Sequence, residues 1–109
     1  MSGSNYSDSK SGTTVNIGAE TLFGFALKAY KTGDFETAAL TFQKIVPTHY
    51  EEWQSRMYLA MSLFQAGNVE DARREFMYIR DWCTNKDMRE RAEAACLGIN
   101  QMMREKSHI

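Results

Sequence analysis

The sequence has very little proline and cysteine, and each scarcity excludes a class of structure. Pro47 is the one proline among 109 residues, which favours long helices because proline breaks a helix interior. Cys83 and Cys96 are the only two cysteines, too few for a disulfide framework. Both lie among helix-forming residues, so we expect them to be reduced, half-buried apolar side chains of a cytoplasmic protein.

The chain also has no excess of charge and no long apolar run. Lys and Arg total 13 and Asp and Glu total 14, a formal net charge of −1, which excludes a strongly basic nucleic-acid-binding protein. No apolar run approaches the roughly 20 residues that span a bilayer. The N-terminus shows no basic region followed by an apolar one, so no secretory signal is expected. We expect one cytoplasmic domain without a nucleic-acid or membrane partner.

Side chains that carry catalysis or bind metals are sparse. His49 and His108 are the only histidines, and Cys83 and Cys96 are 13 positions apart (96 − 83 = 13) on different predicted elements, which is not a metal-ligand spacing. Acidic residues gather at predicted helix starts, where carboxylates usually act as caps. No Gly-rich phosphate loop and no Ser-His-Asp grouping is present. The sequence therefore predicts a non-enzymatic protein with no cofactor and no metal.

The first 17 residues differ in composition from the rest of the chain. Residues 1–17 are rich in Ser, Gly, Thr and Asn and have no apolar period, which predicts a disordered tail. From residue 18 to residue 106 apolar residues recur at helical spacing, which predicts an all-α domain. Its five expected helices are 19–32, 35–46, 53–66, 69–82 and 86–106.

The helical region repeats itself at a fixed interval. Gly33 and Gly67 are 34 positions apart (67 − 33 = 34), and the same shift aligns residues on both sides of them. The aligned pairs include Ala26 with Ala60, Ala38 with Ala72, Phe42 with Phe76, and Ile45 with Ile79. A second step of the same length places Ala94 and Leu97 in line with Ala60 and Leu63. A constant period with two helices per unit predicts a helical repeat protein.

The repeated unit resembles the tetratricopeptide repeat (TPR). The second helix of each unit keeps the family's Ala-x-x-x-Phe pattern, and the first helix has its small residue at Ala26, Ala60 and Ala94. The resemblance covers residues 19–106. The sequence departs from the family pattern at three positions in both units. The aromatic position holds Leu22 and Arg56, the Tyr position holds Ala29 and Leu63, and the closing Pro position holds Tyr50 and Thr84.

The resemblance implies an α-solenoid within a domain at residues 18–106. Its first helical hairpin would cover about 19–52, its second about 53–85, and a capping helix 86–106. That last helix has Glu90 and Glu93 where the earlier units have Leu22 and Phe25, or Arg56 and Leu59. A more polar outer surface of this kind suits the end of a repeat array.

In the TPR family the first helices of successive units line a concave peptide-binding groove. Carried over by helical spacing, the lining here is Phe23, Leu27, Tyr30, Met57, Met61, Phe64, Met88, Arg91, Ala95 and Ile99. The best-known groove of the family holds a C-terminal carboxylate with Lys, Asn and Arg. Only Arg91 is basic among the corresponding positions, so no carboxylate clamp is expected. An apolar, Met-containing groove favours an amphipathic or extended apolar peptide.

Three interpretations of this apolar surface stay open at the level of sequence. The groove binds a segment of another protein, as in an adaptor, scaffold or chaperone. Alternatively it mediates self-association, as in a homodimeric accessory or regulatory subunit, or its residues are ordinary core. Residues 20–67 also resemble the type III secretion chaperones built from these repeats. We take binding of another protein as the prediction.

Overall fold

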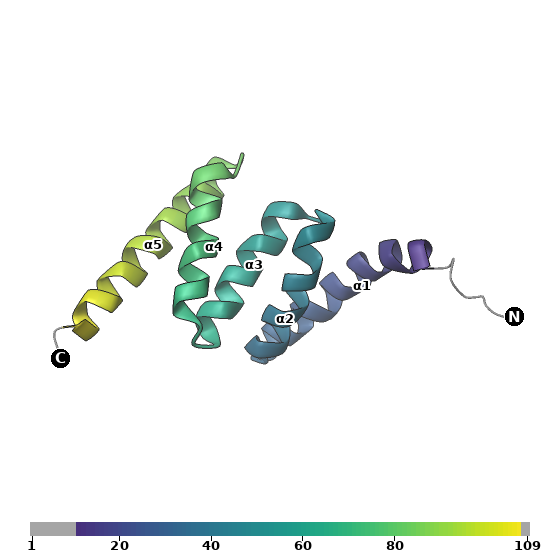
Figure 1. The fold of residues 1–109 in the computed structure, drawn as a ribbon, viewed down its shortest axis with the longest axis horizontal. Coiled ribbons are helices and arrows are strands. Elements are labelled where there is room, and N and C mark those ends of the chain that lie inside the picture. The colour runs from purple at the N-terminus through teal and green to yellow at the C-terminus, as the bar shows by residue number, and fades with distance from the viewer. Residues whose placement is uncertain (1–10, 108–109) are drawn as a thin grey trace, which may run out of the picture.

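The computed structural model describes residues 11–107, with side chains for residues 18–106, and in this range it is all-helical without a strand. The helices are α1 (Ser11–Lys31), α2 (Phe35–Ile45), α3 (Glu52–Gln65), α4 (Val69–Trp82) and α5 (Lys86–Ser107), with a short 3-10 helix η1 (Val46–Thr48) after α2. The predicted all-α fold with five helices is confirmed for the described residues. Figure 1 shows the helices following one another in chain order from one end of the molecule to the other.

Two equivalent turns join α1 to α2 and α3 to α4. Gly33 and Gly67 have φ of +88° and +92°, a left-handed conformation that glycine adopts without strain. In the first turn the Gly33 amide donates to the Tyr30 carbonyl at 3.1 Å, and the Asp34 amide donates to the Ala29 carbonyl at 2.9 Å. In the second turn the Gly67 and Asn68 amides donate in the same way, at 3.1 Å and 2.8 Å. This pair of bonds is the Schellman motif that closes a helix at glycine.

The helices pack in sequence order. Extensive contacts join α1 with α2, α2 with α3, α3 with α4, and α4 with α5. Helix α3 therefore has a helix packed on each of two sides, whereas α1 and α5 each have one such neighbour. This difference sets how much of each helix is buried.

The repeated Ala, Phe and Ile positions of the two hairpins are buried to nearly the same extent. The close-approach residues Ala26, Ala38, Ala60 and Ala72 are all 0% exposed. The larger residues that follow, Phe42, Ile45, Phe76 and Ile79, are at most 6% exposed. Small residues at the crossing points let the helices approach closely, and the larger ones fill the space beside them.

A group of aromatic rings connects the first hairpin to α3. The Phe42 ring stacks on Tyr58 with ring centres 5.4 Å apart and planes 10° apart. Phe23 meets Phe42 edge-on at 5.8 Å, and Tyr50 at 5.5 Å. Tyr30 meets Tyr58 edge-on at 5.4 Å. Offset-stacked and edge-on pairs of this kind add to the stabilisation from burial alone.

The start of the first helix is a correction to the sequence prediction. Helix α1 begins at Ser11, so residues 11–17 are helical in backbone and do not belong to the predicted tail at residues 1–17. Extending a helix that has already formed is far easier than nucleating one, so the polar composition of this segment did not mark the boundary. The rest of that tail, residues 1–10, lies outside the described residues.

The two cysteines are free and buried, as the sequence predicted, and more deeply than expected. Cys83 is 3% exposed and Cys96 is 2% exposed. Burial raises the pKa of the Cys96 thiol above its ordinary value, although the nearby Arg80 and Arg73 act in the opposite direction.

Both thiols should react slowly with Ellman's reagent in the native protein. Burial withholds the sulfur atoms from the reagent, and a raised pKa reduces the reactive thiolate of Cys96. We expect the reaction to be slower than in the unfolded protein by more than about tenfold. The Cys83→Ala variant would report Cys96 alone, and a fast native reaction in that variant would contradict the burial.

Candidate binding groove

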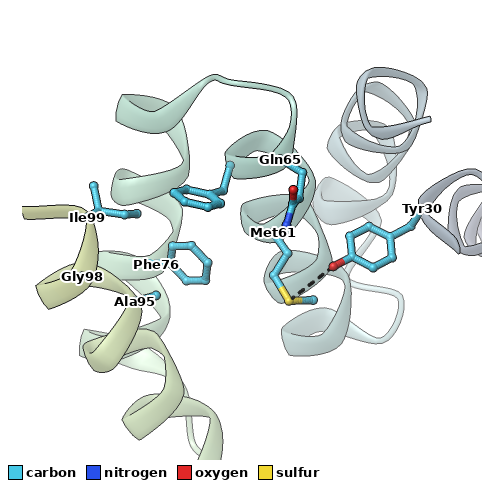
Figure 2. A pocket seen from close by; sticks show the side chains of 8 residues that line it. Tyr30, Met61, Gln65, Phe76, Ala95, Gly98 and Ile99 are labelled. Carbon is cyan, nitrogen blue, oxygen red and sulfur yellow. Dashed lines mark hydrogen bonds between the residues drawn. The ribbon is translucent and has the colours of Figure 1, made fainter. Parts of the chain in front are cut away.

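An apolar pocket of about 280 Å³ opens between α3 and α5. Figure 2 shows α5 on one side, α3 on the other, and Phe76 of α4 between them. The lining residues are Tyr30 from α1, Met61, Phe64 and Gln65 from α3, Phe76 from α4, and Ala95, Gly98 and Ile99 from α5.

The pocket exists because the third unit has small residues where the first two have large ones. At one repeat position the three units carry Tyr30, Phe64 and Gly98. A Cβ atom added at Gly98 would have no atom within 4 Å, so this glycine is not required by close packing. The bulky side chains of α1 and α3 therefore have no counterpart on this part of α5.

A second repeat position shows the same decrease in size. Here the three units carry Leu27, Met61 and Ala95. Ala95 and Gly98 are three residues apart on α5 and so lie on the same side of the helix. Together they form the shallow wall of the pocket.

The polar groups of the pocket lie on the side of α3 and α1. The Gln65 side chain is exposed, and its amide offers both a donor and an acceptor. The Tyr30 hydroxyl donates to the Met61 sulfur at 4.0 Å, which is a weak contact (Figure 2). The hydroxyl oxygen can still accept a hydrogen bond. The remaining lining is apolar, so the pocket suits an apolar group with a polar backbone beside it.

The structure brings five of the ten predicted groove residues together. They are Tyr30, Met61, Phe64, Ala95 and Ile99. Ile99 is only 3% exposed and lines the pocket from the side of α5 (Figure 2). Leu27 and Met88 are half-buried against the core, and Arg91 is exposed without lining the pocket.

Met57 is a correction, because it belongs to the packed interior, whereas Phe23 lies outside the pocket without being fully buried. Phe23 is half-buried and joins the aromatic rings around Phe42 and Tyr58. Met57 is 6% exposed and part of the core. Helix α3 is covered on two sides, so its buried arc is wider than the stripe of a helix at the surface.

Three lining residues were not predicted from the sequence. Gly98 could have been found, because the 34-residue shift from Phe64 ends on it. Phe76 stands at the repeat position of Phe42, and it is 6% exposed while still lining the pocket. Gln65 carries no distinguishing signal, since a polar residue at the end of a helix is ordinary.

Charged residues pair with one another outside the pocket. Arg56 of α3 forms an ion pair with Glu75 of α4 at 2.9 Å and covers the Tyr78 ring, whose centre is 4.2 Å from its guanidinium carbon. Arg73 donates to Glu70 at 2.6 Å, and this bond lowers the pKa of the Glu70 carboxyl. The small stabilisation from that exposed pair is present above the ordinary carboxyl pKa and is lost as the pH falls.

The described residues contain no group of three or more His, Cys, Asp or Glu side chains arranged to hold a metal ion. Within the same range, none of the helices combines the length and the apolar character needed to cross a bilayer.

Comparisons with known proteins found no matching family model, no matching curated protein and no matching solved structure.

Proposed function

We propose that this protein is a non-enzymatic binding module whose groove holds an apolar segment of another protein. In this proposal the five helices form two TPR-like hairpins followed by a capping helix, α5. The matching burial of the repeated Ala, Phe and Ile positions and the two equivalent glycine turns support the repeat architecture.

The pocket at Gly98 is the observation that carries the proposal. Glycine inside a helix reduces helix stability by about 0.5–1 kcal/mol relative to alanine, and no packing contact at Gly98 requires it. The residue keeps an apolar concavity open beside Met61 and Phe76. An open apolar concavity with few polar groups is typical of a binding site.

The size and chemistry of the pocket define what it would hold. Its volume of about 280 Å³ lies just below the range of roughly 300–1,000 Å³ for small-molecule sites. We therefore assign it to one bulky apolar side chain, aromatic or aliphatic, of a bound peptide. The Gln65 amide and the Tyr30 hydroxyl would accept or donate hydrogen bonds to the peptide backbone.

Filling the pocket should weaken peptide binding without harming the fold. Peptides selected from a random displayed library on the wild-type protein would provide the probe. We expect Gly98→Leu to weaken the selected peptides by at least about tenfold, while the thermal midpoint rises because a helix glycine has been replaced.

Gly18→Leu is the matched control. Gly18 also lies in a helix with no atom within 4 Å of an added Cβ, and it is outside the pocket. This variant should gain a similar stability and bind the peptides as the wild type does. Unchanged peptide affinity in Gly98→Leu, or a library that yields no binder, would overturn the proposal.

A further inference from the structure

Helix α1 has an exposed surface that its repeat equivalents bury. Thr21, Phe25 and Lys28 are exposed, and Phe25 is 56% exposed. Their equivalents one repeat later on α3 are Ser55, Leu59 and Ser62, which are 0%, 3% and 0% exposed. Among the described residues no helix covers this surface of α1, and we call Thr21, Phe25 and Lys28 the α1 face.

The described helices leave a different surface of α5 uncovered, one residue further on in the repeat and so about 100° around the helix from the α1 face. Ala94 and Leu97 are exposed, and Leu97 is 64% exposed. The equivalents on α3, Ala60 and Leu63, are 0% and 8% exposed. One repeat earlier still, Ala26 and Ala29 are 0% and 8% exposed. We call Glu90, Ala94 and Leu97 the α5 face.

The two faces are complementary in charge and alike in apolar character. Each presents one large apolar side chain, Phe25 or Leu97, at more than half exposure. Lys28 is the charge within the α1 face, and Lys31 and Glu20 flank it. Glu90 is the charge within the α5 face.

The neighbours of the α5 face are of both signs. Two acidic residues, Glu93 and Asp87, lie beside the face. Two basic residues are also near: the Lys86 Nζ is 3.9 Å from the Glu90 carboxylate, and Arg104 lies about two turns beyond Leu97 on α5. Two α1 faces in contact would put two copies of Lys28 into one interface, and two α5 faces would put two copies of Glu90 there. Unlike faces avoid both repulsions.

We propose that the α1 face of one copy of this chain packs on the α5 face of another, head to tail. Such a contact uses two different surfaces, so a dimer still has one free face of each kind and can add further copies. It is independent of the peptide groove, because neither face includes a lining residue of the pocket.

The association should be weak. One helix pair buries less than the roughly 1,200 Å² of a stable interface, so we expect a Kd of about 10–100 µM. Sedimentation equilibrium of the wild type should show a mean mass that rises with concentration and passes that of a dimer. Higher salt should reduce the mean mass, because the charges of both faces are exposed.

Two variants test the geometry. Phe25→Glu blocks only the α1 face and Leu97→Glu blocks only the α5 face, so each should be monomeric on its own. Mixed in equal amounts, they should form a dimer and nothing larger, because one intact face of each kind remains. The blocked α1 face of one variant should not bind the blocked α5 face of the other, because each of these faces carries an added carboxylate.

Three results would overturn the proposal. The first is a wild type that stays monomeric up to about 500 µM, well above the expected Kd. The second is a single variant that associates as the wild type does. The third is a mixture of the two variants that stays monomeric. Circular dichroism should find both variants folded, because substitutions at exposed positions usually change stability by less than about 0.5 kcal/mol.

Discussion

Replacing Phe42 by alanine should lower the free energy of unfolding by about 3–5 kcal/mol. Phe42 is 0% exposed, and its ring stacks on Tyr58 and meets Phe23 edge-on. Truncation removes both ring contacts and leaves a cavity where the first hairpin meets α3. The thermal midpoint, followed by circular dichroism at 222 nm, should fall by at least about 12 °C.

Phe25→Ala is the matched control for this prediction. It makes the same substitution on an aromatic residue that is 56% exposed, and its effect should stay within about 0.5 kcal/mol. An equally small effect of Phe42→Ala would contradict the assignment of Phe42 to the core.

Met57→Glu should destabilise the protein by several kcal/mol, on the order of 3–5. From the sequence alone Met57 was placed on an open groove, where a glutamate would be tolerated. The structure leaves the residue 6% exposed, so the substitution places a carboxylate in the core without a partner. Urea denaturation at pH 7, compared with the wild type, measures the loss.

The loss in Met57→Glu should become smaller at low pH. Burial disfavours the charged form, so the folded-state pKa of the new glutamate lies above its unfolded value of about 4.3. Such a group destabilises the folded state most at high pH, where it is ionised. This destabilisation becomes smaller as the pH falls through the folded-state pKa toward the unfolded pKa. The difference from the wild type should therefore be smaller at pH 4 than at pH 7.

Met61→Glu is the contrasting variant, one helical turn away on α3. Met61 is half-buried at the pocket, so a carboxylate there can reach water. We expect a loss within about 1 kcal/mol, together with loss of peptide binding. Equal destabilisation by the two substitutions would show that the structure does not separate core from pocket at these positions.

The sequence by itself determined the repeat and its helices. The 34-residue spacing of Gly33 and Gly67 marked both hairpin turns, because a left-handed residue after a helix is readily supplied by glycine. The Ala and Phe positions at the same spacing identified residues that are buried in both hairpins. Helix α4 begins and ends where predicted, and α5 extends one residue further than predicted.

Only the tertiary structure decided which apolar residues are core and which remain accessible. A sequence pattern gives the angular position of a residue around its helix, but exposure depends on how many neighbours cover that side. Leu63 and Leu97 occupy the same repeat position, yet one is 8% exposed and the other 64%. The reason is that α4 packs beside α3, whereas no described helix covers the equivalent side of α5.

The same dependence explains Met57 and the pocket. Met57 and Met61 are four residues apart and look alike in the sequence, but the helices on both sides of α3 bury the first and leave the second at a gap. That gap arises from Ala95 and Gly98 on another helix. A pocket is a space between elements, so its place followed from the packing of α3, α4 and α5 and not from any one of them.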